Sequence, residues 1–380
     1  MRSTVARVGS LTIALALACF ILGASAAFAR TSTAEVQRGL ERLVAAPGGP
    51  PGAIATLYRN GRLTTLSAGR ADVDRKGAPK VTDQMRIASI AKAFSGAVAL
   101  HLVRHGKLQL DQTIGQLLPG MPLDWAPVTI AELLNHTSGL PDYTSSKQFA
   151  KHARTDPRGF VSPAEIIGWV RTDPLGFRPG SSYEYSNTDN IVIGLIVEAI
   201  TGETYGDALN RIVLGPARLG ETSFPAKPAI PSPFIHGYLT APGQEPEDVS
   251  TAFSPSGAWA SGAILSTPKD LNAFIRADLG LEFFGRVQQR QQMRFYPGGE
   301  SSPPGPGRNA AGLALFRYQT RCGTVYGHTG NFPGYVQFAA ATADGRKALT
   351  TTLNIPAPTG SLLAQLRHLQ TTAVCALLGR

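Results

Sequence analysis

The sequence predicts an α+β fold, in which an antiparallel sheet flanked by helices packs against a mainly helical lobe. Strand-like runs lie at both ends of the chain, and short helices with Pro/Gly loops fill its middle. A length of 380 residues, 43% hydrophobic and 16% charged, is enough for a large core. We therefore expect a sheet lobe from 30–88 and 255–380, and a mainly helical lobe from 89–254.

The N-terminus, residues 1–29, has the pattern of a secretory signal peptide. Arg2 and Arg7 precede an uncharged apolar run over 8–22, and Ala27-Phe28-Ala29 supplies small residues for cleavage. A retained membrane anchor and a lipoprotein at Cys19 are the alternatives. Cleavage predicts a secreted, periplasmic or cell-wall-associated protein without stable membrane insertion.

The first half of the chain contains one hairpin signal and two apolar helices. Asn60-Gly61 separates two β-rich runs within 52–70, which is the strongest short hairpin signal. An Ala/Leu/Val-rich helix is expected over 90–105, ending at Gly106, and a buried helix over 191–200.

The second half contains the other strands. Thr267 and Pro268 favour a helix start, and the Gly/Pro/Ser-rich segment 298–308 favours a mobile surface loop. Four strand-like runs and an amphipathic helix follow; they are expected at 312–319, 323–328, 334–342, 347–355 and 361–378.

Two cysteines remain after signal cleavage, Cys322 and Cys375. An even pair in an exported protein favours a disulfide, which would tie a strand to the last helix. Two unpaired buried thiols are the alternative.

Several function classes are disfavoured by composition and motif. The net charge of +10 is scattered rather than gathered into a basic run, so no nucleic-acid partner is expected. His101 and His105 have ligand-like spacing but lack the glutamate of a zinc protease and a third ligand, so no metal is expected. No dinucleotide, P-loop or Gly-x-Ser-x-Gly motif is present.

The strongest chemical signal is Ser89-Ile90-Ala91-Lys92 at the start of the first long helix. Residues three apart share a helix face, so Lys92 can reach the Ser89 hydroxyl. Burial among apolar neighbours can lower the pKa of a lysine toward 7, at which it can act as the base for serine. A second copy, at Ser266 and Lys269, contains a proline and is expected only to cap a helix.

Two further motifs follow in order. Tyr185 and Asn187 lie two apart on a loop, where a phenol can relay protons and an amide can bind a substrate carbonyl. His328-Thr329-Gly330 comes at the end of an expected strand, where Thr329 can donate to substrate and Gly330 lets substrate approach. The backbone amides of Ser89 and Asn331 would form an oxyanion hole.

Together these motifs resemble those of the penicillin-recognising serine hydrolases. That group includes class C β-lactamases, exported D-Ala-D-Ala carboxypeptidases, and related esterases and D-aminopeptidases. Segment 133–143 (LLNHTSGLPDY) looks like the family's signature between motifs one and two, with His136 structural. The resemblance covers about 40 to 375. It implies acyl transfer through Ser89, a site between sheet and helical lobe, and no cofactor.

Details of the motifs resemble the carboxypeptidase branch most. Histidine opens the third motif, and Trp259 in Pro-Ser-Gly-Ala-Trp-Ala looks like a cleft-lining tryptophan, with lobe packing as its alternative. Carboxypeptidases of this type hold the substrate carboxylate with an arginine, where this chain has Phe316 beside Arg317. Neighbouring strand residues point to opposite faces, so Arg317 helps only if the register slips.

The expected function is therefore a penicillin-binding D-Ala-D-Ala carboxypeptidase. Its substrate would be a peptidoglycan stem peptide or a β-lactam, and the expected assembly is a monomer. The alternatives are a β-lactamase, or an esterase or D-aminopeptidase of the same fold. If Arg317 does not reach the site, the esterase or the D-aminopeptidase is favoured. We also expect His328, with a pKa near 6.5, to make carboxylate binding weaken as pH rises through about 7.

Overall fold

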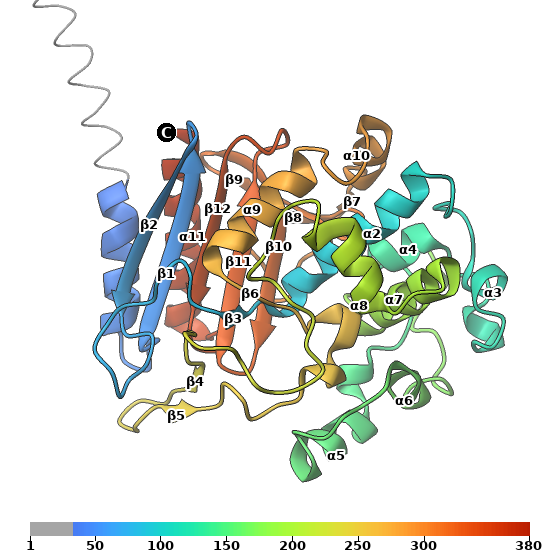
Figure 1. Ribbon diagram of the computed structural model, residues 1–380, viewed down its shortest axis with the longest axis horizontal. Coiled ribbons are helices and arrows are strands. Elements are labelled where there is room, and N and C mark those ends of the chain that lie inside the picture. Colours follow the sequence, from blue (N-terminus) through green and yellow to red (C-terminus); the bar gives the residue numbers. More distant parts are fainter. Residues whose placement is uncertain (1–32) are drawn as a thin grey trace, which may run out of the picture.

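The computed structural model describes residues 33–380, and the expected signal peptide therefore lies outside the described residues. The central feature is an antiparallel sheet whose eight strands come from both ends of this part of the chain (Figure 1). Their order is β2 (Arg62–Gly69), β1 (Gly52–Arg59), β12 (Ala348–Leu353), β11 (Tyr335–Ala341), β10 (Gly323–Phe332), β9 (Phe316–Thr320), β8 (Arg308–Ala311) and β7 (Tyr296–Pro297).

Alternation along the strands gives the sheet two buried faces. In β1, Ala53, Ala55 and Leu57 join the core beneath the helix over 33–45 and α11 (Gly360–Leu378). Ile54, which lies between them, joins the larger core on the opposite face. There α9 (Pro268–Leu279) crosses β1, β11 and β12, and the sheet is covered on both sides (Figure 1).

The helical lobe is built around two apolar helices, α2 (Ala91–Arg104) and α7 (Asn187–Thr201), which pack against each other. Shorter helices surround them: α3 (Ile114–Leu117), α4 (Ile130–Leu134), α5 (Lys147–Thr155), α6 (Pro163–Gly168) and α8 (Tyr205–Leu209). Because α2 also contacts β10, residues at its N-terminus lie where lobe and sheet meet. No helix of the described residues is long and apolar enough to span a bilayer.

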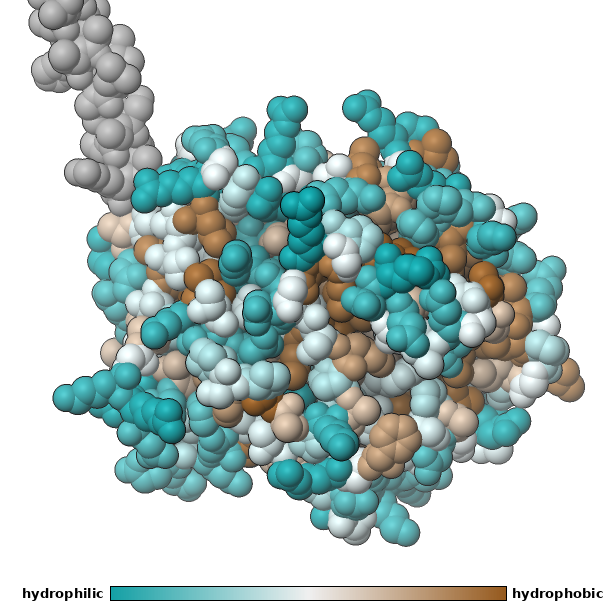
Figure 2. All heavy atoms as spheres, viewed as in Figure 1, coloured by the Kyte–Doolittle hydropathy of each residue, from teal (hydrophilic) through white to brown (hydrophobic). Residues whose placement is uncertain are grey.

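The remaining elements are short. Two small ladders pair β3 (Met85–Arg86) with β6 (Leu265–Ser266) and β4 (Tyr238–Leu239) with β5 (Glu247–Asp248), and α10 (Arg286–Gln292) follows α9. Polar side chains cover most of the face in Figure 2, with hydrophobic ones visible in small areas between them. The exposed large hydrophobic side chains of the described chain are Leu123, Phe160, Leu239 and Val287.

Most expected elements are present, with informative differences. The hairpin turns at Asn60 and Gly61, both with positive φ, and Thr267 caps α9 through the Asp270 amide. The run expected over 312–319 is split, because Gly312 donates to the Leu315 carbonyl in a turn and β9 begins only at Phe316. β10 runs four residues past its expected end, and the helix over 33–45 was not anticipated.

The two cysteines of the described chain are joined. Cys322, at the turn between β9 and β10, forms a disulfide with Cys375 in α11. The crosslink closes a loop over a sequence separation of 53 residues, which contributes about 4 kcal/mol in the chain-entropy model. It ties the strand that carries the third motif to the helix behind it.

Candidate active site

Ser89 lies in the 3-10 turn Ala88–Ile90, immediately before α2. The preceding residue, Ala88, is buried and has a φ of 52°, a left-handed conformation that costs a non-glycine residue about 1–2 kcal/mol. Gly330 of β10 packs against this turn; a Cβ there would lie 2.5 Å from the Ile87 carbonyl oxygen and 3.3 Å from the Ser89 nitrogen. Only glycine allows the strand to approach the serine this closely.

Lys92 has no exposed surface, and its ammonium group has three partners. Nζ lies 3.2 Å from Ser89 Oγ, 2.7 Å from Asn187 Oδ1 and 3.0 Å from the Ser261 carbonyl oxygen. Burial lowers the pKa of Lys92 to about 7, although the nearby carboxylates of Asp142 and Asp189 oppose this shift. A neutral amine of that pKa, within reach of a hydroxyl, can accept its proton.

Asn187 is oriented by a carboxylate that the sequence analysis did not single out. Its Nδ2 donates to Asp142 Oδ2 and Oδ1 at 3.1 and 3.3 Å, which leaves Oδ1 facing Lys92. Asp142 in turn accepts from Thr144 and from the Asn187 amide. Asp142 lies in the segment 133–143 that carried the family resemblance, but no sequence spacing places it beside Asn187, 45 residues later.

Tyr185 forms the side of the site between Lys92 and β10. Lys92 Nζ lies 5.0 Å from the centre of its ring. Burial raises the pKa of the Tyr185 phenol far above its ordinary value, against an opposing contribution from the Ser89 hydroxyl. The phenol is therefore neutral and holds a proton beside the serine.

A buried pair supports Tyr185 from behind. The His136 ring lies 4.4 Å from the Tyr185 ring, and its Nδ1 is 2.8 Å from Asp189 Oδ2. Ser138 donates to the other Asp189 oxygen at 2.6 Å. Burial lowers the pKa of His136 and raises that of Asp189. His136 therefore lies where the sequence analysis expected a structural histidine.

His328 and Thr329 are both buried, and one polar atom of each is bonded to a backbone carbonyl, while His328 Nε2 has no hydrogen-bond partner. His328 Nδ1 lies 2.5 Å from the Thr329 carbonyl oxygen, so this nitrogen carries the hydrogen. Burial, together with the charge of Lys92, lowers the pKa of His328 to about 3. The expected titration of His328 near pH 7 is therefore wrong, because the ring stays neutral. Thr329 Oγ1 donates to the Pro303 carbonyl at 2.6 Å instead of facing the cavity.

Arg317 does not reach the site. β9 pairs with β10 so that Phe316 lies opposite Gly327 and Arg317 opposite Tyr326, without a slip in register. The Arg317 guanidinium stacks 5.0 Å from the centre of the Phe295 ring, whereas Phe316 packs against His328 and Tyr185. The expectation that Arg317 binds substrate is therefore not met, because alternation of side chains turns it to the other face of the sheet.

Trp259 also lies away from the nucleophile. Its ring packs against Tyr205, at 5.4 Å between centres, and covers Gly194 of α7. It lines a separate hollow on the helical lobe rather than the cavity that contains Ser89. The residue two positions on, Ser261, supplies the carbonyl that accepts from Lys92, so the ring anchors the turn that carries this acceptor.

One cavity contains the nucleophile. It has a volume of about 570 Å³, and Ser89, Tyr185, Asn187 and Asn331 all line it. Its other lining is mainly aromatic or small, and includes Asp142, Phe149, His152, Pro157, Phe253, Ser302 and Phe332. The Asn331 side-chain oxygen accepts from the Ala357 amide at 2.7 Å, which leaves its backbone and its side-chain NH₂ for a substrate.

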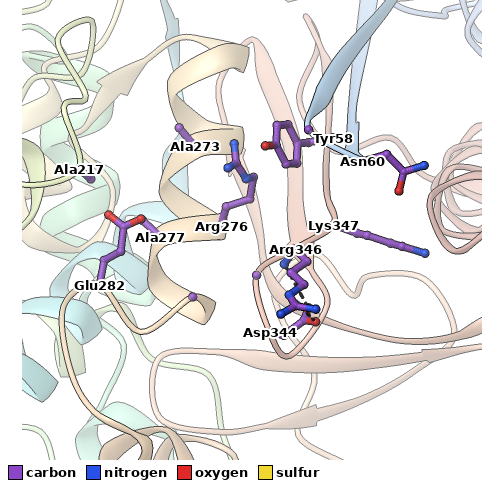
Figure 3. Close-up of a pocket in the computed structure, with 13 residues that line it drawn as sticks. Tyr58, Asn60, Ala217, Ala273, Arg276, Ala277, Glu282, Asp344, Arg346 and Lys347 are labelled. Carbon is purple, nitrogen blue, oxygen red and sulfur yellow. Dashed lines mark hydrogen bonds and ion pairs between the residues drawn. The ribbon is translucent and has the colours of Figure 1, made fainter.

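A second groove, of about 620 Å³, lies beside α9 and the turn between β11 and β12 (Figure 3). In it the Arg276 guanidinium stacks 3.4 Å above the Tyr58 ring, and Arg346 pairs with Asp344. Neither Ser89 nor Lys92 lines this groove, so the chemistry of the three motifs belongs to the smaller cavity.

Comparisons with known proteins agree with this geometry. A D-stereospecific amidohydrolase from Streptomyces sp. is 29% identical, with a TM-score of 0.75, over 89% of this chain and 98% of that structure. The D-amino acid amidase from Ochrobactrum anthropi SV3, complexed with L-phenylalanine amide, is 25% identical, with a TM-score of 0.80, over 91% and 98%.

Curated relatives are longer than this chain. Penicillin-binding protein 4* of Bacillus subtilis is 26% identical over 299 residues, which is 74% of this chain and 63% of the relative. Protein flp of Staphylococcus aureus is 30% identical over 46% of this chain and 35% of its own length. The chain thus spans less than two thirds of these relatives.

The family model described as Beta-lactamase matches residues 40–372, which include the whole cavity and both lobes. With Ser89, Lys92 and Tyr185 brought together as the motifs predicted, the chain belongs to the β-lactamase family of serine hydrolases, homologous to penicillin-binding proteins.

Proposed function

We propose that this protein hydrolyses amides or esters of D-amino acids through an acyl-enzyme on Ser89. The observation that carries the proposal is the direction of Arg317. Its guanidinium stacks on Phe295, and no arginine lines the cavity in the described chain. A carboxypeptidase must bind the terminal carboxylate of its substrate, and an arginine in the cavity is the strongest partner for that group. A cavity without an arginine suits a substrate without a terminal carboxylate, and two solved relatives are named as a D-stereospecific amidohydrolase and a D-amino acid amidase.

Acylation follows from the contacts of the cavity. Neutral Lys92, 3.2 Å away, takes the proton of Ser89 Oγ as that oxygen attacks the substrate carbonyl. The backbone amides of Ser89 and Asn331 would hold the oxyanion. The neutral Tyr185 phenol passes a proton to the leaving nitrogen and is restored from Lys92, which keeps the site free of net charge. Water then releases the acyl group by the reverse proton path.

The cavity also fits the acyl part of such a substrate. Aromatic rings of Phe149, Phe253 and Phe332 line it and suit a large apolar side chain. Asp142 is the carboxylate in the lining, and an ammonium group on the substrate would be attracted to it while a carboxylate would be repelled. The aromatic lining thus favours an apolar side chain, and Asp142 favours an amino acid with a free amine.

A D-Ala-D-Ala carboxypeptidase that binds penicillin is the second candidate. It is supported by the similarity to penicillin-binding protein 4* and by the His-Thr-Gly motif on β10. In either case an exported location agrees with the Cys322–Cys375 disulfide, since such bonds persist in oxidising compartments.

The test is intact mass of the purified protein over time with benzylpenicillin, beside product analysis with D-phenylalanine amide. The proposal expects ammonia and D-phenylalanine from the amide and no persistent penicillin adduct. A stable adduct on Ser89, together with D-alanine release from a pentapeptide and no amide turnover, would support the carboxypeptidase instead. A Ser89→Ala variant is the control for both assays.

A further inference from the structure

The loop between β7 and β8 covers the third motif. We call Gly299–Gly305 the cap segment. The Pro303 carbonyl of this segment accepts the Thr329 hydroxyl at 2.6 Å, and Thr329 is 1% exposed. Ser302 lines the cavity beside Ser89. The cap segment therefore occupies the place where a substrate group would meet Thr329.

Hydrogen bonds hold the cap segment at both ends. The Tyr183 hydroxyl donates to the Glu300 carbonyl at 2.5 Å, and the Tyr318 hydroxyl donates to Ser301 Oγ at 2.9 Å. The Gly305 amide donates to Asn309 Oδ1 at 2.9 Å. Tyr318 is fully buried, and a side chain at Gly305 would collide with its ring. The segment expected to be a surface loop is thus bonded to residues of β8 and β9, and its Ser302 lines the cavity.

The position of Tyr185 indicates where the leaving group lies. Because the phenol donates the proton that the departing atom needs, that atom must lie beside it. Behind Tyr185 are the rings of His328, at 6.3 Å, and Phe316, at 6.5 Å between centres. His328 has no exposed surface. Tyr185, with these rings behind it, and Ser302 of the cap segment thus line the part of the cavity where the leaving group lies.

The charges around the leaving group also favour an uncharged one. His328 is neutral, Thr329 is already engaged, and the Arg317 guanidinium stacks on Phe295. A carboxylate on the leaving group would lose its hydration and gain no paired cation, which is costly in a buried place.

We propose that the cap segment restricts this enzyme to small uncharged leaving groups, namely ammonia from a primary amide or a short alcohol from an ester. This inference rests on the proposed function. In the amide reaction the Ser89 Oγ–carbon bond forms and the carbon–nitrogen bond breaks. The Ser89 proton passes to Lys92, and a proton from Tyr185 goes to the nitrogen, which leaves as ammonia.

The test compares three substrates that share one acyl group: D-phenylalanine amide, D-phenylalanyl-D-alanine amide and D-phenylalanyl-D-alanine. We expect kcat/KM on the dipeptide amide to be at least tenfold below that on the primary amide, and on the free dipeptide at least a hundredfold below. Equal rates on the primary amide and the dipeptide amide would overturn the restriction by size. Turnover of none of the three would overturn the proposed function as well, whereas turnover of all three at similar rates would overturn this inference alone.

Two variants show whether the cap segment is responsible. Deletion of 300–304 leaves a short loop between β7 and β8, and we expect the ratio of primary amide to dipeptide amide kcat/KM to fall at least tenfold. Tyr318→Phe removes only the hydrogen bond to Ser301, keeps the buried ring, and should lower the ratio two- to fivefold. Tyr326→Phe, which removes a hydroxyl from the adjacent strand, is the matched control and should leave the ratio unchanged. An unaltered ratio in Tyr318→Phe and in a folded deletion variant would overturn the inference.

Discussion

The two walls beside Ser89 both carry polar residues of the three motifs, but the polar groups on the two walls are oriented and bonded differently. On the wall formed by the 3-10 turn Ala88–Ile90, α2 and the start of α7, the polar atoms of Lys92, Asn187 and Tyr185 converge on Ser89. On the wall formed by β9 and β10, Arg317 turns away, His328 is neutral, and Thr329 is bonded to the cap segment. The first wall thus holds the groups that acyl transfer needs, and on the second wall the groups that could bind a carboxylate are neutral, bonded or turned away.

The difference teaches that a motif can be present while its polar groups are bonded to other parts of the chain. All three motifs lie in order along the sequence, and all three meet at the cavity. What distinguishes the walls is the environment of each polar group. Buried Lys92 lies within reach of the Ser89 hydroxyl, whose proton it can accept, whereas His328 Nδ1 and the Thr329 hydroxyl are bonded to backbone carbonyls.

The largest expected effect comes from removing the nucleophile on the converging wall. Ser89→Ala should lower kcat/KM on D-phenylalanine amide by about 10⁴ or more, because acyl transfer then has no attacking oxygen. Steady-state kinetics and the absence of any acyl adduct by mass spectrometry check it. Turnover close to wild type would place the chemistry outside this cavity.

Lys92→Met should lower kcat/KM by about 10³, because the serine loses its base while the buried shape is nearly kept. In the wild type, kcat/KM should rise with pH through about 7 and then level off, as Lys92 loses its proton. A profile that stays flat between pH 6 and 8 would argue against Lys92 as the base.

The same variant tests the burial of Lys92 independently of activity. The folded-state pKa of about 7 lies below the unfolded value of 10.5, so the unfolded chain holds more protons between these pH values. Wild-type stability should therefore rise relative to Lys92→Met as pH increases from 7 to 10.5, by at most about 1.4 kcal/mol per pH unit. Denaturant unfolding at pH 7 and 9 measures it, and a difference of the opposite sign would contradict the burial.

Tyr185→Phe should have a smaller effect, about 10²-fold on kcat/KM with the amide. It should cost less with the methyl thioester of D-phenylalanine, whose small leaving thiolate has less need of a proton. Comparing the two substrates gives the measurement, and an equal loss on both would assign Tyr185 to packing. Tyr326→Phe, which removes a tyrosine hydroxyl outside the cavity lining, serves for comparison because it should not discriminate between the amide and the thioester in this way.

The smallest effect is expected on the strand wall. Arg317→Ala should change kcat/KM and KM less than twofold on any of these substrates, because its guanidinium contacts Phe295 rather than the cavity. Arg321→Ala, at the exposed turn after β9, is the control for the loss of a positive charge. A tenfold rise in KM for a carboxylate substrate in Arg317→Ala alone would show that the strand wall does bind carboxylates.

Much of the fold could be predicted from local sequence. Asn60-Gly61 specifies its turn because both residues adopt positive φ, and the apolar spacing of 361–378 specifies α11. The split at Gly312–Leu315 and the extra length of β10 could not be predicted, because strand boundaries depend on which strands become neighbours. The helix over 33–45 is stabilised by packing Val36, Leu40 and Leu43 on the sheet.

The sequence by itself determined the reactive set: Ser89 and Lys92 one helical turn apart, then Tyr185 with Asn187, and His328-Thr329-Gly330 on a strand. These relations are local, since spacing along a helix or loop decides which side chains can meet. Only the tertiary structure decided the roles of Asp142, Trp259, Arg317 and the cap segment. Each depends on contacts between residues far apart in the chain, and on whether burial leaves a polar group free or already bonded.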